Sequence, residues 1–515
     1  MTTTARPAGT GAGGGPTPST RAVAAEAVGL VARRAAALDI ALHTVEVSVR
    51  GELVAHAACA PRGPHVPQRM YSVSKTVTGL AVGLLEAEGA LSADDPITAH
   101  FPEMSPVHPW LEATTIRHLL TMRGPHRSTT YRLTEGDWLA SYFRVPPTHP
   151  PGTLFTYDTS AAYTLAALVE RLSGASLADY LRPRLSDPLG VGPDLRFLTG
   201  PDGISHGGSG LICTPRDLLR LAHLLLADGV HDGVRLIPAG HLRDTFRPQA
   251  DTTQLTWGGT LRGGYGYQTW LPARGGWLMF GLGGQIVYGD PARGLAVVVT
   301  ADAQACTGGD QRLLDDVMDR LVDPLTAAID GGAIDGGAID GGVSGGGASA
   351  GGVSGLRLEW PAPGRVRAEA DTSGGTGAPP PARAGAPASV VAGTYRNVMD
   401  GPGPAELALV LGDGGHGGGV GRLSATSGHR EPDWSVELRL DGPVSTRIGG
   451  DPAVVTAGCP DPSTLDVRCA VHGEDLATWR FRLAWAPDGS LAVRAQAFCE
   501  SADPAWTFEA TYVRV

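Results

Sequence analysis

The sequence predicts an α/β domain followed by an all-β domain. Strand patterns occur at both ends of the first 325 residues, with helical patterns between them. This order fits one antiparallel sheet built from both ends of the segment, with a helical region inserted. Beyond residue 388 apolar and polar residues alternate, as on half-buried antiparallel strands. With 515 residues and 42% hydrophobic content, the chain can build a core in each domain.

The elements of the first domain follow in order. A helix is expected from Thr20, a candidate N-cap, to about Leu38. Alternating valines at 45–49 and a turn at Arg50-Gly51 predict a hairpin. Apolar residues at spacings of three and four predict a helix from near Ser72, with Gly89 as C-cap. Further helical patterns cover 116–122, 161–172 and 215–227, and strand patterns cover 265–271, 277–280, 286–288 and 295–300.

Two segments lack the pattern of a packed domain. Residues 1–20 are rich in Thr, Gly, Pro and Ala, and are predicted to be disordered. Residues 326–388 contain three copies of Ala-Ile-Asp-Gly-Gly and then Gly- and Pro-rich sequence, which predicts a flexible linker. The predicted domains are therefore 21–325 and 389–515, the second a small antiparallel sandwich or barrel.

Charge and motifs exclude several classes of function. A net charge of −11 argues against a nucleic-acid or anionic-membrane partner. No apolar run is long enough for a membrane span or a signal peptide, so we expect a cytoplasmic protein. The six cysteines lie far apart, and neither Cys-x-x-Cys nor His-Glu-x-x-His occurs. We therefore expect no metal site and no cofactor.

Lys75 is the single lysine among 41 basic residues. It follows Ser74, which excludes the Gly-Lys pair of a P-loop. Ser72 lies three residues before it at the predicted helix start, so both side chains share a face near free backbone N–H groups. The amine can accept the serine proton, and the Ser72 N–H can stabilise an oxyanion. The alternative is a helix cap with an unrelated lysine. Acyl transfer is favoured because a chain that otherwise uses arginine keeps a lysine here, and a lysine amine, unlike an arginine guanidinium, can lose its proton.

Two further segments could complete such a site. Tyr157 lies in a polar loop before a helix, and a nearby cationic Lys75 would lower the pKa of its phenol, which could then act as base or acid. Gly283 and Gly284 precede Gln285 within a predicted strand, where glycines indicate close backbone approach. A substrate carbonyl could meet the Gln285 N–H. The alternatives are a tyrosine packed at a helix start and a bulge in the sheet.

Together these motifs resemble the penicillin-recognising serine hydrolases, which include class C β-lactamases, DD-peptidases, esterases and 6-aminohexanoate-dimer hydrolases. The resemblance covers about residues 20–325. It rests on the following motifs: Ser72-x-x-Lys75, Leu84–Gly89, Asp94-Asp95-Pro96, Ile116–Met122, Pro151-Gly152-Thr153, Tyr157, Asp187–Gly190, Thr214–Asp217 and Gly283-Gly284-Gln285.

The resemblance implies a β-lactamase-like fold and an acyl-enzyme on Ser72. By the same resemblance, Lys75 and Tyr157 manage protons, and the N–H groups of Ser72 and Gln285 form the oxyanion hole. The C-terminal β domain resembles the lipocalin-like extension of some members.

Two departures from the family pattern bear on the substrate. The family's Tyr-x-Asn is here Tyr157-Asp158-Thr159, so Thr159 offers a hydroxyl in place of an amide. The Lys/His-Thr/Ser-Gly motif is here Leu282-Gly283-Gly284, which lacks the cation that grips a substrate carboxylate. We expect Thr159, Gly283 and Gly284 to contact a substrate without a critical carboxylate.

The predicted function is hydrolysis of a small ester, amide or peptide through an acyl-enzyme. One alternative is acyl transfer to an amine, including release or cyclisation of a peptide from a carrier. A second alternative is a penicillin-binding sensor that acylates slowly or not at all, which the departures at Thr159 and Leu282 motivate.

Overall fold

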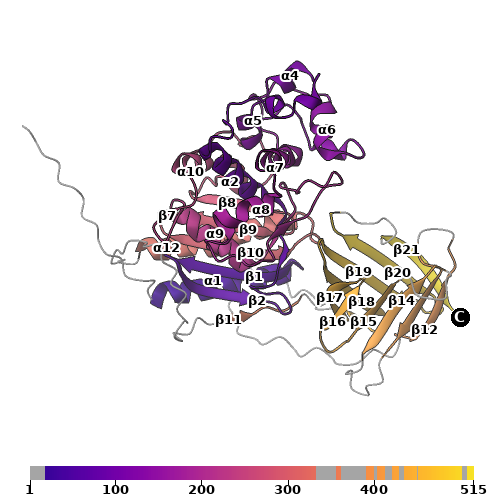
Figure 1. Cartoon of the computed structure of the whole chain (residues 1–515). Helices are drawn as coiled ribbons and strands as arrows, with labels where there is room; N and C mark the ends of the chain where they lie inside the picture. Colours follow the sequence, from indigo (N-terminus) through magenta and orange to yellow (C-terminus); the bar gives the residue numbers. More distant parts are fainter. Residues whose placement is uncertain are drawn as a thin grey trace, which may run out of the picture. The chain divides into compact units, whose positions relative to one another are not determined.

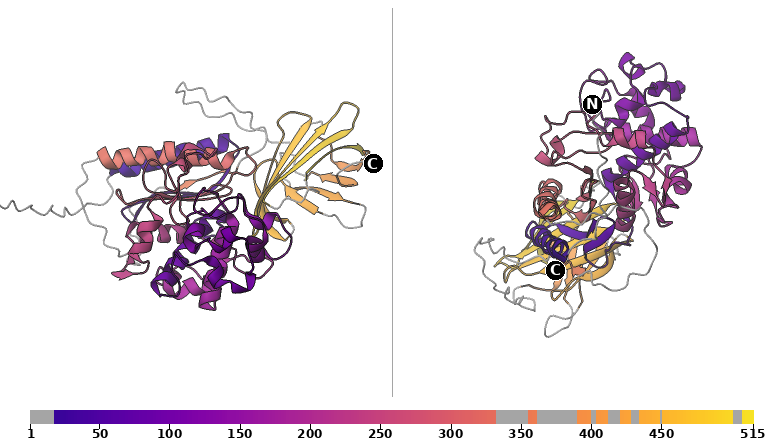
Figure 2. Two further views of the ribbon diagram at one scale, coloured as in Figure 1. Left: turned by 90° about the horizontal axis from the view of Figure 1, so that it is seen from above. Right: turned by 90° about the vertical axis from the view of Figure 1, so that its left-hand side faces the viewer.

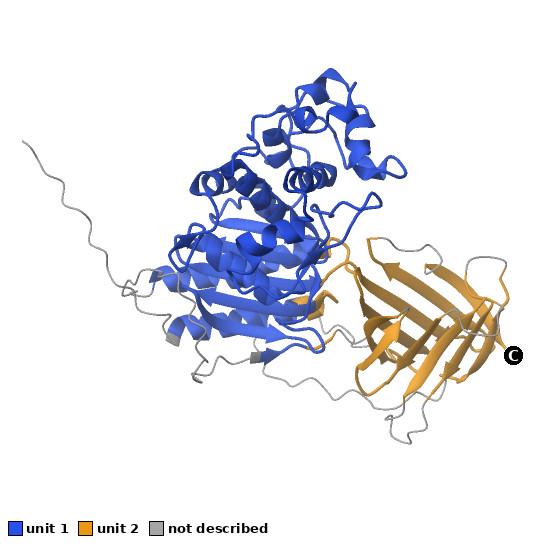
Figure 3. Cartoon of the chain, in the orientation of Figure 1, with its two compact units in different colours: residues 1–34, 42–301, 310–358 blue, residues 35–41, 302–309, 359–515 orange. Residues whose placement is uncertain are grey.

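A computed structural model describes residues 18–331, 355–360, 390–399, 403–411, 420–427, 434–448, 450–500 and 507–515. These residues form two compact units (Figure 3). The first takes residues 1–34, 42–301 and 310–358, and the second takes 35–41, 302–309 and 359–515. Residues 1–17 of the segment predicted to be disordered lie outside the described residues. Most of the predicted linker, 326–388, lies outside them as well.

The first unit is built on a six-stranded sheet with the order β11-β2-β1-β10-β9-β8. β1 and β10, which come from the two ends of the segment, are hydrogen-bonded neighbours at the centre of the sheet. The pairs β1–β2, β9–β10 and β8–β9 are antiparallel, and the predicted fold class is confirmed. β11 instead runs parallel to β2, and its residues fall within the predicted linker. The strands are β1 (Ala41–Val49), β2 (Glu52–Ala58), β8 (Trp277–Gly281), β9 (Gln285–Asp290), β10 (Leu295–Asp302) and β11 (Gly355–Arg357).

The local sequence explains the first hairpin and the sheet centre. Arg50 and Gly51 both have positive φ, +53° and +79°, as the tight turn of a two-residue hairpin requires. β9 and β10 are buried along their whole length, so their side chains fill the space on both faces of the sheet. This double burial accounts for their continuous apolar sequence.

Helices cover both faces of the sheet. α1 and α12 lie together on one face, and the inserted helical region lies on the other (Figures 1 and 2). α9 begins as its sequence predicts, with Thr214 and Asp217 forming a capping box around Pro215. The longer helices are α1 (Pro18–Ala37), α2 (Ser74–Ala87), α7 (Thr159–Ser173), α9 (Pro215–Leu226), α11 (Gly309–Val317) and α12 (Asp323–Gly331). The shorter ones are α3 (Ile97–His100), α4 (Pro109–Glu112), α5 (Ile116–Leu120), α6 (Trp138–Arg144), α8 (Leu177–Leu181) and α10 (Ala239–Thr245).

The strand predicted at 265–271 is wrong. The segment makes only isolated bridges, one of them between Tyr265 and Trp270 within itself. Gly266 explains the irregular path, because a Cβ there would lie 1.9 Å from the carbonyl oxygen of Thr245. Gln268 adds a left-handed φ of +53°, which breaks strand geometry.

The second unit is a ten-stranded antiparallel sheet in the order β15-β14-β13-β12-β21-β20-β19-β18-β17-β16. Its end strands β15 and β16 contact each other, so the sheet curls into a nearly closed, barrel-like shape. This confirms the predicted antiparallel β domain. Its strands are β12 (Gly393–Asn397), β13 (Glu406–Val410), β14 (Gly421–Thr426), β15 (Trp434–Leu438), β16 (Val444–Ile448), β17 (Asp451–Gly458), β18 (Thr464–His472), β19 (Leu476–Trp485), β20 (Leu491–Phe498) and β21 (Phe508–Arg514).

One face of each of these strands builds the core of the second unit. Tyr395, Leu465 and Tyr512 are among its fully buried side chains. Trp485 donates a hydrogen bond from its indole nitrogen to the Tyr395 hydroxyl at 3.0 Å, which satisfies a polar atom in this core. Within the described residues, no helix combines the length and apolar character needed to cross a bilayer.

Candidate active site

Ser72 lies in a single 3-10 turn, Tyr71–Val73, that leads directly into α2. Tyr71 just before it has a left-handed φ of +47°, a conformation that costs energy for a residue with a side chain. The Arg69 guanidinium lies 4.5 Å from the centre of the Tyr71 ring and packs over it. Ser72 itself is partly exposed, whereas Ser74 is fully buried.

The amine of Lys75 is buried and faces three oxygen acceptors. It lies 3.0 Å from Ser72 Oγ, 3.2 Å from Thr159 Oγ1 and 2.7 Å from the carbonyl oxygen of Gly208. The side chain is only 1% exposed. Three acceptors match the three N–H donors of an ammonium group. The structure therefore brings Ser72, Lys75 and Thr159 together.

The glycine loop 207–210 carries the shortest of these contacts, and the sequence analysis assigned it no role. A Cβ on Gly208 would lie 2.5 Å from Thr159 Cγ2, and one on Gly207 would lie 2.6 Å from the Cβ of Ala166. Thr78 also donates a hydrogen bond to the Gly207 carbonyl at 2.8 Å. The run of glycines was the available signal: only a backbone without side chains fits between α2 and α7 here.

Tyr157 lies beside Lys75 but is not acidified by it. The amine is 4.7 Å from the centre of the Tyr157 ring. Burial raises the pKa of the phenol well above its ordinary value, and contacts with the side chains of Ser72 and Trp270 offset this only in part. The predicted lowering of this pKa is therefore wrong. The phenol is therefore held in its protonated form.

Asp158 is a buried carboxyl group next to this set. It is 4% exposed and caps α7, accepting hydrogen bonds from the backbone nitrogen of Ser160 at 2.8 Å and from the Ser160 hydroxyl. Burial raises the pKa of Asp158 to about 6, against the opposing effects of Ser160 and Lys75. The next residue, Thr159, donates its backbone N–H to Thr129 Oγ1 at 3.1 Å. These contacts fix the start of α7 beside Lys75.

The residues after α5 support the loop that carries Tyr157. The carbonyl oxygen of Met122 accepts a hydrogen bond from the backbone N–H of Thr156 at 2.8 Å. The sulfur atom of Met122 lies 3.4 Å from the backbone nitrogen of Asp158. The carbonyl of Arg123 accepts the N–H of Gly152 at 2.7 Å. The segments 116–122 and 151–153, which carry part of the family resemblance, thus act as a frame for Tyr157.

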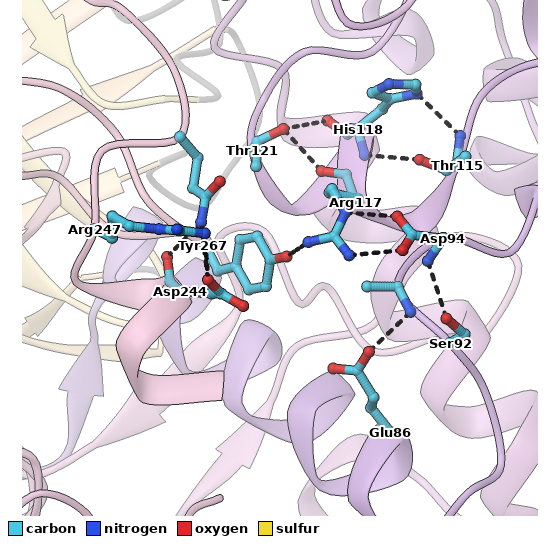
Figure 4. Close-up of polar contacts among 12 residues, drawn as sticks. Glu86, Ser92, Asp94, Thr115, Arg117, His118, Thr121, Asp244, Arg247 and Tyr267 are labelled. Carbon is cyan, nitrogen blue, oxygen red and sulfur yellow. Dashed lines mark hydrogen bonds and ion pairs between the residues drawn. The ribbon is translucent and has the colours of Figure 1, made fainter. Parts of the chain in front are cut away.

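α5 is itself tied down by a polar network (Figure 4). The Arg117 guanidinium pairs with both carboxylate oxygens of Asp94, at 2.6 and 2.9 Å, and donates to the Tyr267 hydroxyl. Thr115 and His118 form a capping box at the helix start. This network connects the motifs at 94–96 and 116–122. In this structure these motifs therefore stabilise the segments that support the loop carrying Tyr157.

The glycines before Gln285 form a turn and do not lie inside a strand. Gly283 and Gly284 have φ of +81° and +89° and connect β8 to β9. A Cβ on Gly284 would lie 2.6 Å from Leu313 Cδ2. Turn geometry and packing therefore explain both glycines. Their predicted contact with substrate stays a prediction.

The last residue of β8, Gly281, nevertheless lies close to Ser72. A Cβ on Gly281 would stand 2.4 Å from the Met70 carbonyl oxygen, 3.2 Å from the backbone nitrogen of Ser72 and 3.2 Å from Gln285 Cβ. The Gln285 side chain is fully buried and donates to the carbonyl of Ala301 at 2.7 Å. The predicted contact of a substrate with the Gln285 N–H stays a prediction.

Aromatic side chains that the sequence analysis missed surround Tyr157. Its ring stacks on Trp270 at 5.2 Å and meets Trp257 edge-on at 5.4 Å. Tyr265 and Phe155 pack on Trp270 at 4.9 and 5.8 Å. We call these five residues the aromatic cluster. Nothing in the local sequence groups them, because they come from two segments about a hundred residues apart.

Comparison with known proteins agrees with this geometry. The profile of the Beta-lactamase family matches residues 29–316, more than half of the chain. This protein belongs to the Beta-lactamase family. The predicted membership of the penicillin-recognising serine hydrolases is confirmed.

Individual relatives of this Beta-lactamase family member are distant. Protein Rv1367c of Mycobacterium tuberculosis (strain ATCC 25618 / H37Rv) is 28% identical over 232 residues, which cover 34% of this chain and 57% of the relative. The chain thus spans little more than half of that protein. The 6-aminohexanoate-dimer hydrolase of Paenarthrobacter ureafaciens is 25% identical over 267 residues, 47% of this chain and 67% of the relative.

Among solved structures, a candidate beta-lactamase from Bacteroides dorei superposes with a TM-score of 0.51 at 16% identity. The match covers 59% of this chain and 98% of that one. It shows a shared fold, and the predicted β-lactamase-like fold class is confirmed.

Proposed function

We propose that this chain hydrolyses an ester or amide bond through an acyl-enzyme on Ser72. The observation that carries the proposal is the 3.0 Å contact between the buried Lys75 amine and the partly exposed Ser72 hydroxyl. A serine becomes a useful nucleophile only when a nearby base takes its proton. Lys75 is the group within reach that can do so once it has lost one of its own protons.

The proposed reaction proceeds in two halves. Ser72 Oγ attacks the carbonyl carbon while its proton passes to the Lys75 amine, and the N–H groups of Ser72 and Gln285 stabilise the oxyanion. Tyr157, whose raised pKa keeps it protonated, donates a proton to the leaving oxygen or nitrogen and regains one from Lys75. Water then attacks the acyl-enzyme by the reverse proton path and releases the acid.

The departures from the family pattern favour a neutral substrate. Thr159 occupies the position next to Lys75 and can offer one hydroxyl. Leu282 lies in the β8–β9 turn, so this turn presents no cation to a substrate carboxylate. These two features support an ester or amide without a critical carboxylate.

The test combines turnover with covalent labelling. We expect steady hydrolysis of p-nitrophenyl acetate and labelling by a fluorescent fluorophosphonate, both lost in Ser72→Ala. A stable adduct without turnover would instead support a sensor, and capture of the acyl group by added amines at the expense of hydrolysis would support an acyltransferase. Turnover that persists in Ser72→Ala would overturn the proposal.

A further inference from the structure

Trp257 differs from the rest of the aromatic cluster in its exposure. Its side chain is 42% exposed, whereas Trp270 and Tyr265 are 3% and 1% exposed. Within the described residues, every other tryptophan, tyrosine and phenylalanine is buried or half-buried. A single exposed apolar residue needs no special explanation. This one is set apart by its place, in ring contact with the phenol that faces Lys75.

The segment around Trp257 is held in place. Its backbone carbonyl accepts a hydrogen bond from Arg262 Nε at 3.1 Å. The next residue, Gly258, packs so closely on Gln311 that a Cβ would lie 2.2 Å from its side-chain nitrogen. The indole also packs on Trp270, with ring centres 5.7 Å apart. The exposed face of Trp257 is therefore presented at a defined position.

A second exposed apolar side chain adjoins the aromatic cluster in the sequence. Leu154, which precedes Phe155 of the aromatic cluster, is 56% exposed. The Lys75 amine, 4.7 Å from the centre of the Tyr157 ring, is already contacted by three acceptors. A flat apolar group beside Tyr157 would cover exposed apolar surface and could adopt the ring-to-ring distances that aromatic pairs prefer.

Building on the proposed function, we propose that Trp257 determines specificity by binding an aryl or similarly flat apolar group of the ester or amide substrate. The group lies next to the scissile carbonyl, on the acyl side or the leaving-group side. Trp257 acts through contact with the substrate and takes no part in the proton transfers.

The first test measures kcat/KM for ethyl acetate, ethyl phenylacetate and benzyl acetate by proton release at fixed pH. We expect the wild type to prefer at least one aryl ester over ethyl acetate by about tenfold or more, since burial of apolar surface favours binding. Trp257→Ala should lower this preference to within about threefold, while Trp257→Phe keeps most of it. Trp110→Ala is the matched control, because that half-buried tryptophan of α4 packs on His108.

An unchanged preference in Trp257→Ala would overturn the inference while the proposed function stood. A second measurement does not depend on turnover: calorimetric binding of N-benzylphenylacetamide to Ser72→Ala, with and without Trp257→Ala. We expect a roughly tenfold loss of affinity on removal of the indole. If no ester is hydrolysed but Trp257→Ala still lowers the affinity for N-benzylphenylacetamide, the proposed function is wrong. The inferred binding site for flat apolar groups is then still supported. Equal affinity of the two variants would contradict the site.

Discussion

The Lys75 amine donates a 2.7 Å hydrogen bond to the carbonyl oxygen of Gly208, a residue 133 positions away in the sequence. This contact connects the amine to a segment far from Ser72 in the sequence. Because the Gly208 backbone packs closely against Thr159, the same glycine positions two of the groups around Ser72. The geometry of the site therefore depends on a residue that carries no functional side chain.

We expect Gly208→Ala to lower the rate of acylation by tenfold or more, because the new methyl group would lie 2.5 Å from Thr159 Cγ2 and displace the Lys75 acceptor. The measurement is kcat/KM with an activated ester. Gly63→Ala is the control, since a Cβ there meets nothing within 4 Å. Equal activity of the two variants would show that the Gly208 contact is dispensable.

Ser72→Ala and Ser74→Ala should separate chemistry from folding. Loss of the nucleophile should abolish labelling and lower turnover by orders of magnitude. Ser74 instead accepts the backbone N–H of Leu211 at 2.9 Å in a fully buried position. Its loss leaves a buried donor unsatisfied, at a cost of about 1–3 kcal/mol in the free energy of unfolding. We expect Ser74→Ala to keep its labelling but to melt at a lower temperature. Loss of labelling in Ser74→Ala, with labelling kept in Ser72→Ala, would contradict the assignment of Ser72.

Lys75→Arg tests whether the amine must transfer a proton. Arginine keeps the positive charge but does not deprotonate near neutral pH. We therefore expect Lys75→Arg to be nearly as inactive as Lys75→Ala in acylation by an activated ester between pH 6 and 10. Near-normal rates for Lys75→Arg across this range would mean that a fixed positive charge is enough.

Tyr157→Phe should lower the rate without changing the shape of the pH profile. Burial raises the pKa of Tyr157 well above its ordinary value, so the phenol stays protonated between pH 6 and 10. Removing a proton donor of this kind typically costs about 10²–10⁴ in rate. The check is a pair of pH–rate profiles for an unactivated ester. A rise with pH that the wild type shows and Tyr157→Phe lacks would contradict a protonated phenol.

Asp158 should make the folded protein less stable as pH rises. Its pKa is raised from 3.8 to about 6 in the folded state. The folded state thus binds more protons between these values, and the stabilisation present below pH 4 is lost as pH rises through 6. The shift corresponds to about 3 kcal/mol.

An asparagine side chain in place of this carboxyl group would not titrate and would still cap α7. We therefore expect Asp158→Asn to raise the Tm above wild type at pH 8 but not at pH 4. Calorimetric melting at both pH values checks this. A difference between the two proteins that does not change with pH would show that the carboxyl ionises as it does in solution.

Local signals in the sequence were sufficient for much of the fold. Thr214-Pro215 predicted the start of α9, and Arg50-Gly51 predicted the turn of the first hairpin; both depend on chemistry within a few residues. The single lysine of the sequence pointed to a site shared with Ser72. The structure places the Lys75 amine 3.0 Å from Ser72 Oγ. That strands from both ends of the segment meet at the centre of the sheet followed from the order of the elements alone.

What the sequence could not predict depends on burial and on long-range packing. The pKa of Tyr157 was expected to fall because a cation is near, but desolvation of the phenol has the larger effect and raises it. The segment 265–271 has the alternation of a strand, yet the close approach of Gly266 to Thr245 gives it an irregular path. Trp257 and Trp270 reach Tyr157 only through the folded chain.

The central claim is an acyl-enzyme on Ser72, and the most direct test is to locate the adduct. Cleavage after Arg69 and Lys75 with trypsin isolates residues 70–75, which contain Ser72 and Ser74. After reaction with a fluorophosphonate, and separately with an ester substrate quenched in acid, fragmentation by mass spectrometry should place the added mass on Ser72. An adduct on Ser74, or on any peptide outside 70–75, would contradict the account.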